Sequence, residues 1–233
     1  MIRPIHPRYW LRHASVRRAI RNYPYYDVPH KQKEITLGEQ MAQENFSYFM
    51  GERVTRLSYF TGWLRTNFRI DAALTGDGLR KVSQWVDDYG GALIGDEADR
   101  LSIYQCYQPR WEGPYVGYNV MMDIGVFLGE YLVSKRPKLG WEIYRGNDNI
   151  PTNRLEVEYL KPCLGGIPLF PIFPLNTAFG VVANSHQRAL IQSNYDHTLP
   201  DALIIGAKSA LYMSRMMADP NTVVIGDSSN ECL

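Results

Sequence analysis

The chain has 233 residues, of which 45% are hydrophobic, 12% are aromatic and 21% are charged. These values are ordinary for a globular protein, and they allow one large domain or two small ones with a core that needs no disulfide or metal. Cys106, Cys163 and Cys232 are far apart and form no CxxC pair, which argues against a zinc site and a disulfide framework. No apolar run reaches the length of a transmembrane helix, so we expect a cytoplasmic protein without a membrane span.

The net charge of +1 conceals an uneven distribution of charge. Residues 1–33 contain eight basic residues and one acidic residue, so this segment carries +7 and the remaining 200 residues carry −6. Four prolines in the same segment restrict any helix to 9–22. We interpret residues 1–33 as a basic arm, rich in proline and tyrosine, that lies across the body of the protein or is partly disordered.

Helical periodicity begins after the arm. Apolar residues recur at steps of three and four through 36–67, which predicts one amphipathic helix, or two helices joined near Gly51. A further helix is predicted over 79–89, followed by a glycine pair that ends it. Residues 101–107 favour a strand, although a helix there remains an alternative.

The second half of the chain mixes both kinds of element. Residues 141–145 and 154–160 alternate with period two around a turn-rich segment, which predicts a β-hairpin. Four prolines and two glycines in 161–174 block any long regular element, so this apolar segment is either an ordered loop held against the core or an exposed docking surface. A short element is predicted at 179–183 and a final helix over 202–217.

The segment 116–137 predicts a helix that carries two acids and two glycines, with Asn119 as its N-cap. Asp123 and Glu130 share one face, and Gly125 and Gly129 share another. Glycine inside a helix costs about 1 kcal/mol relative to alanine. The two glycines therefore predict close approach by another backbone or by a bulky ring.

The two acids on this helix have a structural and a catalytic interpretation. Seven positions place the carboxylates two turns apart, roughly 10 Å by helical rise, which is too far for a shared proton or a single metal ion. We favour structural anchoring, with Arg145, Arg154 or a backbone amide as partners. The alternative is a small hydrolase that uses Asp123, Glu130 or Glu142, with at least two of these acids facing one pocket.

The segments "GYNVMMDIGVFLGEYL" and "RPKLGWEIYRG" resemble a motif in a family of bacterial domains of unknown function, in which a helix resembling "GDGLRKVSQWVDDYG" lies upstream. The resemblance covers residues 70–183 and leaves the arm outside it. It implies an α+β domain in which Gly129, Glu130 and Trp141 belong to one structural core. It implies no activity, although some such domains resemble partner-binding or immunity-type proteins.

Common catalytic and cofactor signatures are not found in the sequence, which contains no GxSxG, HExxH or GxGxxG pattern. His186, Asp196 and His197 form a local His/Asp cluster, but their spacing is more typical of loop hydrogen bonding than of metal binding. We therefore predict no cofactor and no metal site.

Aromatic residues interleave with arginines in the arm, which is typical of surfaces that bind proteins or nucleic acids. The candidate binding residues are Trp10, Arg17, Arg18, Tyr25 and Tyr26 of the arm, with Phe170 and Phe173 of the apolar proline-rich segment.

The sequence as a whole predicts an α+β fold with helices packed around a small antiparallel sheet. The predicted organisation is a basic arm at 1–33, a single domain at 34–225 and a flexible tail at 226–233. The leading hypothesis for function is a non-enzymatic protein-binding module, adaptor-like or immunity-like, that buries aromatic anchors in a groove of its partner. The alternatives are the carboxylate hydrolase and a nucleic-acid contact made by the arm.

Overall fold

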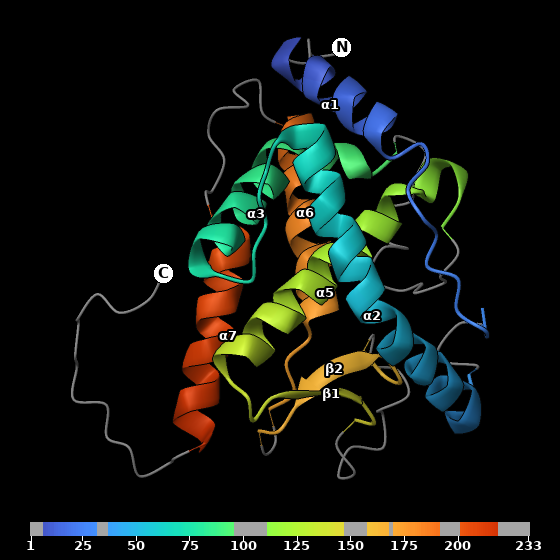
Figure 1. Ribbon diagram of the computed structural model, residues 1–233, viewed down its shortest axis with the longest axis vertical. Helices are drawn as coiled ribbons and strands as arrows, with labels where there is room; N and C mark the ends of the chain where they lie inside the picture. Colours follow the sequence, from blue (N-terminus) through green and yellow to red (C-terminus); the bar gives the residue numbers. More distant parts are fainter. Residues whose placement is uncertain are drawn as a thin grey trace.

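Helices dominate the computed structural model, which describes residues 7–31, 37–95, 111–146, 158–167, 170–191 and 201–218 (Figure 1). The elements in chain order are α1 (Pro7–Ala19), α2 (Glu39–Phe68), α3 (Gly76–Tyr89), η2 (Gly90–Leu93), η3 (Gly113–Tyr115), α5 (Gly117–Lys135), β1 (Gly140–Ile143), β2 (Pro162–Gly165), α6 (Pro174–Ile191) and α7 (Ala202–Ala218). The fold class is α+β, as predicted, with a small antiparallel sheet at one end of the helices. Within the described ranges, no helix is both long and apolar enough to cross a membrane.

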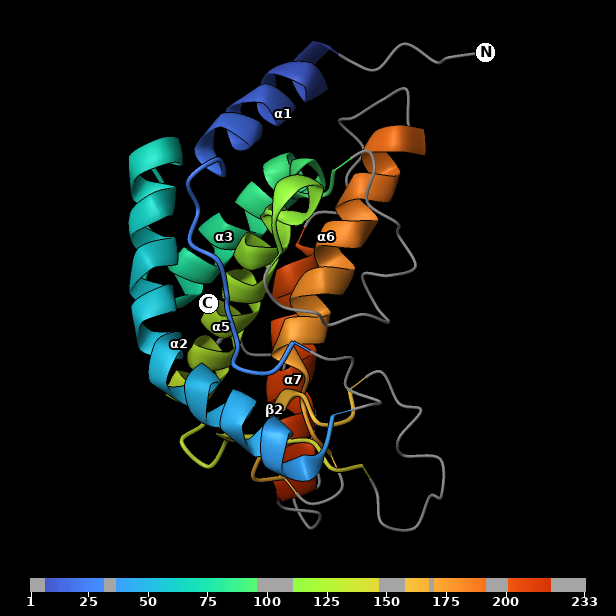
Figure 2. The same cartoon turned by 90° about the vertical axis from the view of Figure 1, so that its right-hand side faces the viewer.

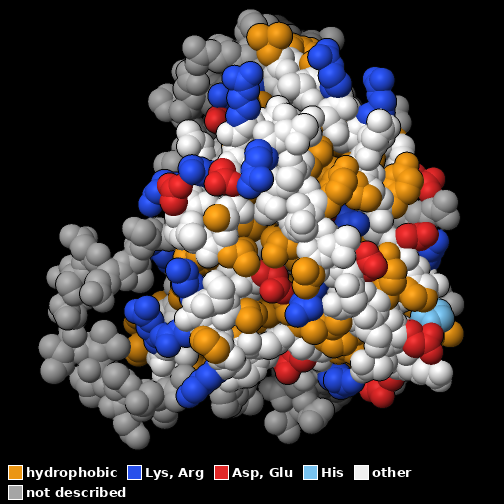
Figure 3. All heavy atoms as spheres, viewed as in Figure 1, with side chains coloured by type: hydrophobic (Ala, Val, Ile, Leu, Met, Phe, Trp, Pro, Cys, Tyr) orange, Lys and Arg blue, Asp and Glu red, His pale blue; other side chains and the backbone are white. Residues whose placement is uncertain are grey.

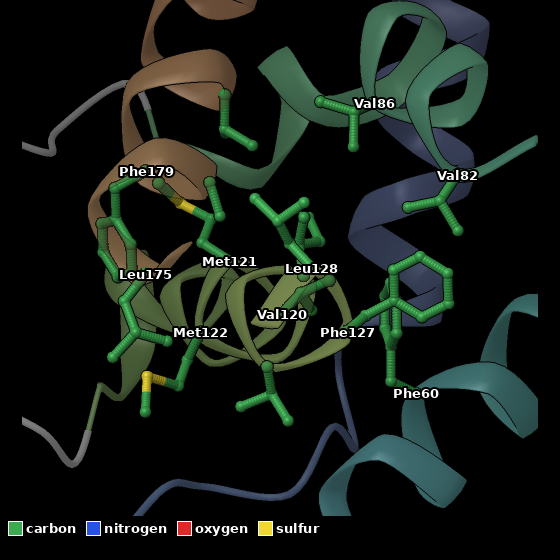
Figure 4. Close-up of a cluster of buried hydrophobic side chains, with 14 of the residues drawn as sticks. Phe60, Val82, Val86, Val120, Met121, Met122, Phe127, Leu128, Leu175 and Phe179 are labelled. Carbon is green, nitrogen blue, oxygen red and sulfur yellow. The ribbon is translucent and has the colours of Figure 1, made fainter. Parts of the chain in front are cut away.

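Helix α5 lies at the centre of the core. It is buried on all sides from Gly117 to Gly129, which is expected of a helix whose apolar residues surround its axis. Its side chains meet Leu175 and Phe179 of α6, while Phe127 points toward Phe60 of α2 (Figure 4). The helix that carries Asp123 and Glu130 is therefore the packing centre of the molecule.

The predicted helices are present, with two differences. Of the two alternatives for 36–67, the structure shows the single helix: α2 is continuous through Gly51. Asn119 is not an N-cap: α5 begins two residues earlier, and the Asn119 side chain is fully buried. Helix α6 is much longer than the short element predicted at 179–183. The final helix closely matches its predicted bounds.

The predicted pairing of the hairpin strands is wrong. Strand β1 pairs antiparallel with Pro162–Gly165, in the register that places Trp141 opposite Leu164, so its observed partner follows the predicted strand at 154–160 in the sequence. Pro162 is tolerated because it is the first residue of its strand. A further bridge joins Leu164 to Ile172, so this part of the apolar segment is an ordered structure held against the core.

The described part of the basic arm contributes to the same core as the rest of the chain. Val16, Ile20, Tyr23, Tyr26 and Val28 are each at most 3% exposed and belong to the main hydrophobic cluster. After α1, the chain descends along α2 and α5 (Figure 2). The boundary predicted at residue 33 therefore does not separate two cores. The strand predicted at 101–107 and the tail predicted at 226–233 lie outside the described residues.

Cys163 lies in β2 and is fully buried. Burial raises the pKa of its thiol to about 12, and the charge of Glu142 adds to this rise. Because the thiolate is the reactive form, we expect iodoacetamide at about pH 8 to spare Cys163 in the folded protein and to modify it after denaturation. Peptide mass spectrometry distinguishes this cysteine from Cys106 and Cys232. Equal modification of Cys163 before and after denaturation would contradict the buried strand.

Candidate functional site

Asp123 is the centre of a buried polar network between α5 and α2. Its carboxylate is completely buried and accepts two hydrogen bonds from Arg56, one from Nε at 2.6 Å and one from Nη2 at 2.8 Å. The Tyr23 hydroxyl donates a third hydrogen bond to Asp123 at 2.7 Å. A guanidinium and a carboxylate that meet through two parallel bonds form one of the strongest polar contacts in proteins.

The rest of the network attaches the segment after α1 to the two helices. Arg56 donates to the backbone oxygens of Tyr25, at 3.2 Å, and of Asn119, at 3.3 Å. The Asn119 side chain accepts from the Tyr26 backbone amide at 2.8 Å and donates to the Trp111 carbonyl at 2.9 Å. These groups satisfy one another inside the core, so the network acts as an anchor for the arm.

The protonation states in the network follow from burial and neighbouring charge. Burial raises the pKa of Asp123 to about 6, although the charge of Arg56 and the bonds from Arg56 and Tyr23 oppose the rise. Burial also raises the pKa of Tyr23 well above its usual value, and the charge of Asp123 adds to that effect. At neutral pH the carboxyl is therefore ionised, while the tyrosine keeps the proton that it donates.

Glu130, two turns further along α5, makes a second and separate anchor. One of its carboxylate oxygens accepts from Arg53 Nε at 3.0 Å and from Trp141 Nε1 at 2.8 Å. The Trp141 ring packs against Phe49, with ring centroids 4.9 Å apart. Glu130 therefore joins α5 to α2 and to strand β1.

The structure gives the two acids partners that were not predicted. Arg56 and Arg53 of α2 hold Asp123 and Glu130, whereas Arg145 is exposed and Arg154 lies outside the described residues. The reason is that α2 packs along the face of α5 that carries both acids. Arg53 and Arg56, which are one turn apart on α2, therefore lie opposite these acids.

The structure does not bring the three candidate catalytic carboxylates together in one cleft. Asp123 is fully buried. Glu130 lies two turns further along α5, where it pairs with Arg53, and Glu142 is exposed on β1. A general acid–base pair requires two such groups to reach one substrate. Among the described residues, no three His, Cys, Asp or Glu side chains gather as metal ligands.

The two glycines of α5 each face a close neighbour. A Cβ atom at Gly129 would lie 2.1 Å from Cζ2 of the Trp141 ring, and one at Gly125 would lie 2.7 Å from Cα of Leu175. Gly129 leaves room for the Trp141 ring, and Gly125 leaves room for the backbone of α6. Both distances are shorter than a side-chain carbon tolerates, so glycine is needed for packing at each position.

The outer face of α1 presents both apolar and basic side chains. Trp10 and Leu11 are 58% and 74% exposed, and Arg18 is exposed on the same side of the helix. Arg21, in the turn that follows α1, is also exposed. Figure 3 shows Lys and Arg side chains beside hydrophobic ones at the upper end of the molecule, over α1. Val16 and Ile20 hold the opposite face of α1 in the core, so the outer face is presented from a fixed position.

A cleft of about 270 Å³ lies at the foot of α1. Its lining residues are Arg17, Ile20, Arg21, Tyr25, Gly113 and Val116. None of the three candidate catalytic acids lines this cleft.

The other candidate binding residues have mixed positions. Tyr25 is 45% exposed, but Tyr26 is 1% exposed, and its ring lies 5.5 Å from the Arg56 guanidinium inside the core. Phe170 packs against the main core, and Phe173 meets Tyr144 with ring centroids 5.0 Å apart. The Tyr26 side chain is therefore part of the core and not part of a surface.

Sequence reasoning missed the arginines of α2, Tyr23, Leu11 and Arg21. Arg53 and Arg56 are three residues apart, which places them on one face of their helix. This spacing could have indicated that they face a second helix with two acids on one side. In the His/Asp cluster, which was not predicted to bind a metal, His186 is buried, and its Nδ1 lies 2.7 Å from the Gly91 carbonyl oxygen. Asp196 and His197 lie outside the described residues.

Comparisons of the chain with protein-family models, curated proteins and solved structures find no match.

Proposed function

We propose that the chain is a protein-binding module and that the outer face of α1, formed by Trp10, Leu11 and Arg18, is its binding surface. The observation that carries this proposal is the exposure of Trp10 and Leu11 on a helix whose inner face is fixed in the core. A large aromatic ring on a preorganised helix loses little conformational freedom on binding, and such rings are frequent binding hot spots.

The charge of the same helix specifies the partner further. The described helix α1 contains basic residues in its last turn and no acid in its first. Arg12 forms an ion pair with Asp88 at 3.0 Å, and Arg17 donates to the Ile94 carbonyl at 3.2 Å, so these two side chains also hold α1 in place. Arg18 remains exposed beside the apolar pair, which favours a partner with an apolar groove edged by acidic residues.

The experiment that tests this function is quantitative affinity isolation with the full chain. Trp10→Ser combined with Leu11→Ser is expected to reduce the recovered partner at least ~10-fold, since loss of a hot spot costs about 2 kcal/mol or more. The matched control is Ile205→Ser combined with Tyr212→Ser, which removes two exposed apolar side chains from α7. The control is expected to recover the partner as the unchanged protein does.

Two outcomes of this experiment contradict the proposal. Equal recovery by both double variants means that α1 is not the surface, and loss only with the α7 variant assigns binding to α7. Recovery that disappears on nuclease treatment and falls steeply with added salt supports a nucleic-acid contact instead. The ion pair of Arg12 with Asp88 counts against that alternative, since it leaves one fewer cation of α1 to neutralise phosphates.

A further inference from the structure

The cleft at the foot of α1 has the composition of an anion site. The described residues that line it include two arginines and no carboxylate. Arg17 uses Nη2 to donate to the Ile94 carbonyl and places Nε 3.5 Å from His13, which leaves part of its five-donor guanidinium for a ligand. Arg21 is exposed, and among the described residues no acidic side chain pairs with it. Two guanidinium groups that converge on one cleft suit a phosphate, whose oxygens accept several charge-assisted bonds at once.

The remaining lining residues define the rest of the ligand. Ile20 and Val116 supply apolar surface, and Tyr25, which is 45% exposed, lines the same cleft. A volume of about 270 Å³ is slightly below the roughly 300–1,000 Å³ that is typical of pockets for drug-sized molecules. The space therefore suits a small ligand with one planar ring.

We propose that this cleft binds a small phosphate monoester that carries a planar ring, with the phosphate between Arg17 and Arg21 and the ring against Tyr25. The walls come from the arm and from the turn before α5, so a bound ligand joins the arm to the body. The proposal does not depend on the protein-binding function, because Trp10 and Leu11 do not line the cleft.

The test titrates the full chain with phenyl phosphate and with inorganic phosphate at an ionic strength of about 0.15 M, where the Debye length is about 8 Å. Binding is followed by calorimetry and by amide chemical shifts. Arg21→Gln is expected to weaken the binding of both probes at least ~10-fold, because it removes charge-assisted bonds. Arg18→Gln is the matched control: it removes the same charge from an exposed position on α1 that does not line the cleft. Its expected effect is within about 2-fold, since a side chain that does not line the cleft makes no bond to the ligand, and salt screens its exposed charge.

Tyr25→Leu tests the position of the ring, and it is expected to weaken phenyl phosphate while it leaves inorganic phosphate unchanged. Circular dichroism verifies that each variant is folded. Equal effects of Arg18→Gln and Arg21→Gln would overturn the site, because they indicate diffuse attraction to a basic helix. Absence of saturable binding by either probe would also overturn it, and equal affinity for the two probes would overturn the assignment of a ring-bearing ligand.

Discussion

Asp123→Asn is expected to lower the free energy of unfolding by roughly 3–5 kcal/mol, because it leaves the Arg56 charge buried without its partner. The shape of the side chain is conserved, so the loss measures charge and hydrogen bonding and not a cavity. Arg56 and Asp123 are 6% and 0% exposed, and water does not replace the lost carboxylate. Urea denaturation, followed by circular dichroism, gives the change.

The chain offers a matched control for this prediction. Arg65 and Asp71 form a pair of the same chemistry at 2.7 Å, but their side chains are 69% and 66% exposed. Asp71→Asn is therefore expected to leave the free energy of unfolding almost unchanged, since water and salt screen exposed pairs. If the two substitutions have the same effect, the buried network does not stabilise the fold in the way described.

A second pair of substitutions tests the packing of α5. Gly125→Ala places a methyl group 2.7 Å from Cα and 2.8 Å from Cδ2 of Leu175, which requires α6 to move away from α5. Overpacking of this kind costs typically 1–3 kcal/mol, and the gain in helix propensity of about 1 kcal/mol offsets only part of it. We expect Gly125→Ala to lower the free energy of unfolding by roughly 1–3 kcal/mol in the same urea experiment.

Gly51→Ala serves as the control and is expected to have the opposite sign. No atom lies within 4 Å of a Cβ built at Gly51, which is in the middle of α2. Alanine there improves helix propensity without a clash, and the expected gain is up to about 1 kcal/mol. A Gly125→Ala variant that is as stable as the unchanged protein would show that α5 and α6 are not in close contact at this position.

Local patterns predicted the helices well, because three- and four-residue spacing depends only on neighbours along the chain. Helices α2, α3 and α7 are present near the predicted bounds. The ion pairs were not predicted, since Arg56 is 67 positions from Asp123 and the spacing on one helix does not determine which helix faces it. The strand partner of β1 was missed for a related reason: prolines in 161–174 obscured a short strand that tolerates Pro162 at its first position.

The role of the arm was also incompletely predicted. Its arginines dominate the composition, but Val16 and Ile20 are four residues apart on the opposite face of α1, and this spacing indicates a buried stripe. Tyr26 was predicted to be a binding residue and is instead a member of the core, as is Tyr23. The outer face of α1 keeps exposed apolar and basic side chains, so Trp10, Leu11 and Arg18 remain available for binding.

Hydrogen exchange of the Tyr23 and Tyr26 backbone amides tests the central claim most directly, which is that the Asp123 network makes the arm part of the core. The Tyr26 amide donates to Asn119, and the Tyr23 amide donates to the Ile20 carbonyl at 3.0 Å. The account predicts that both amides exchange in the folded protein as slowly as those in the middle of α5, and that Asp123→Asn accelerates them more than it accelerates α7. Exchange of these amides at the rate of an unstructured chain, in the unchanged protein, would contradict it.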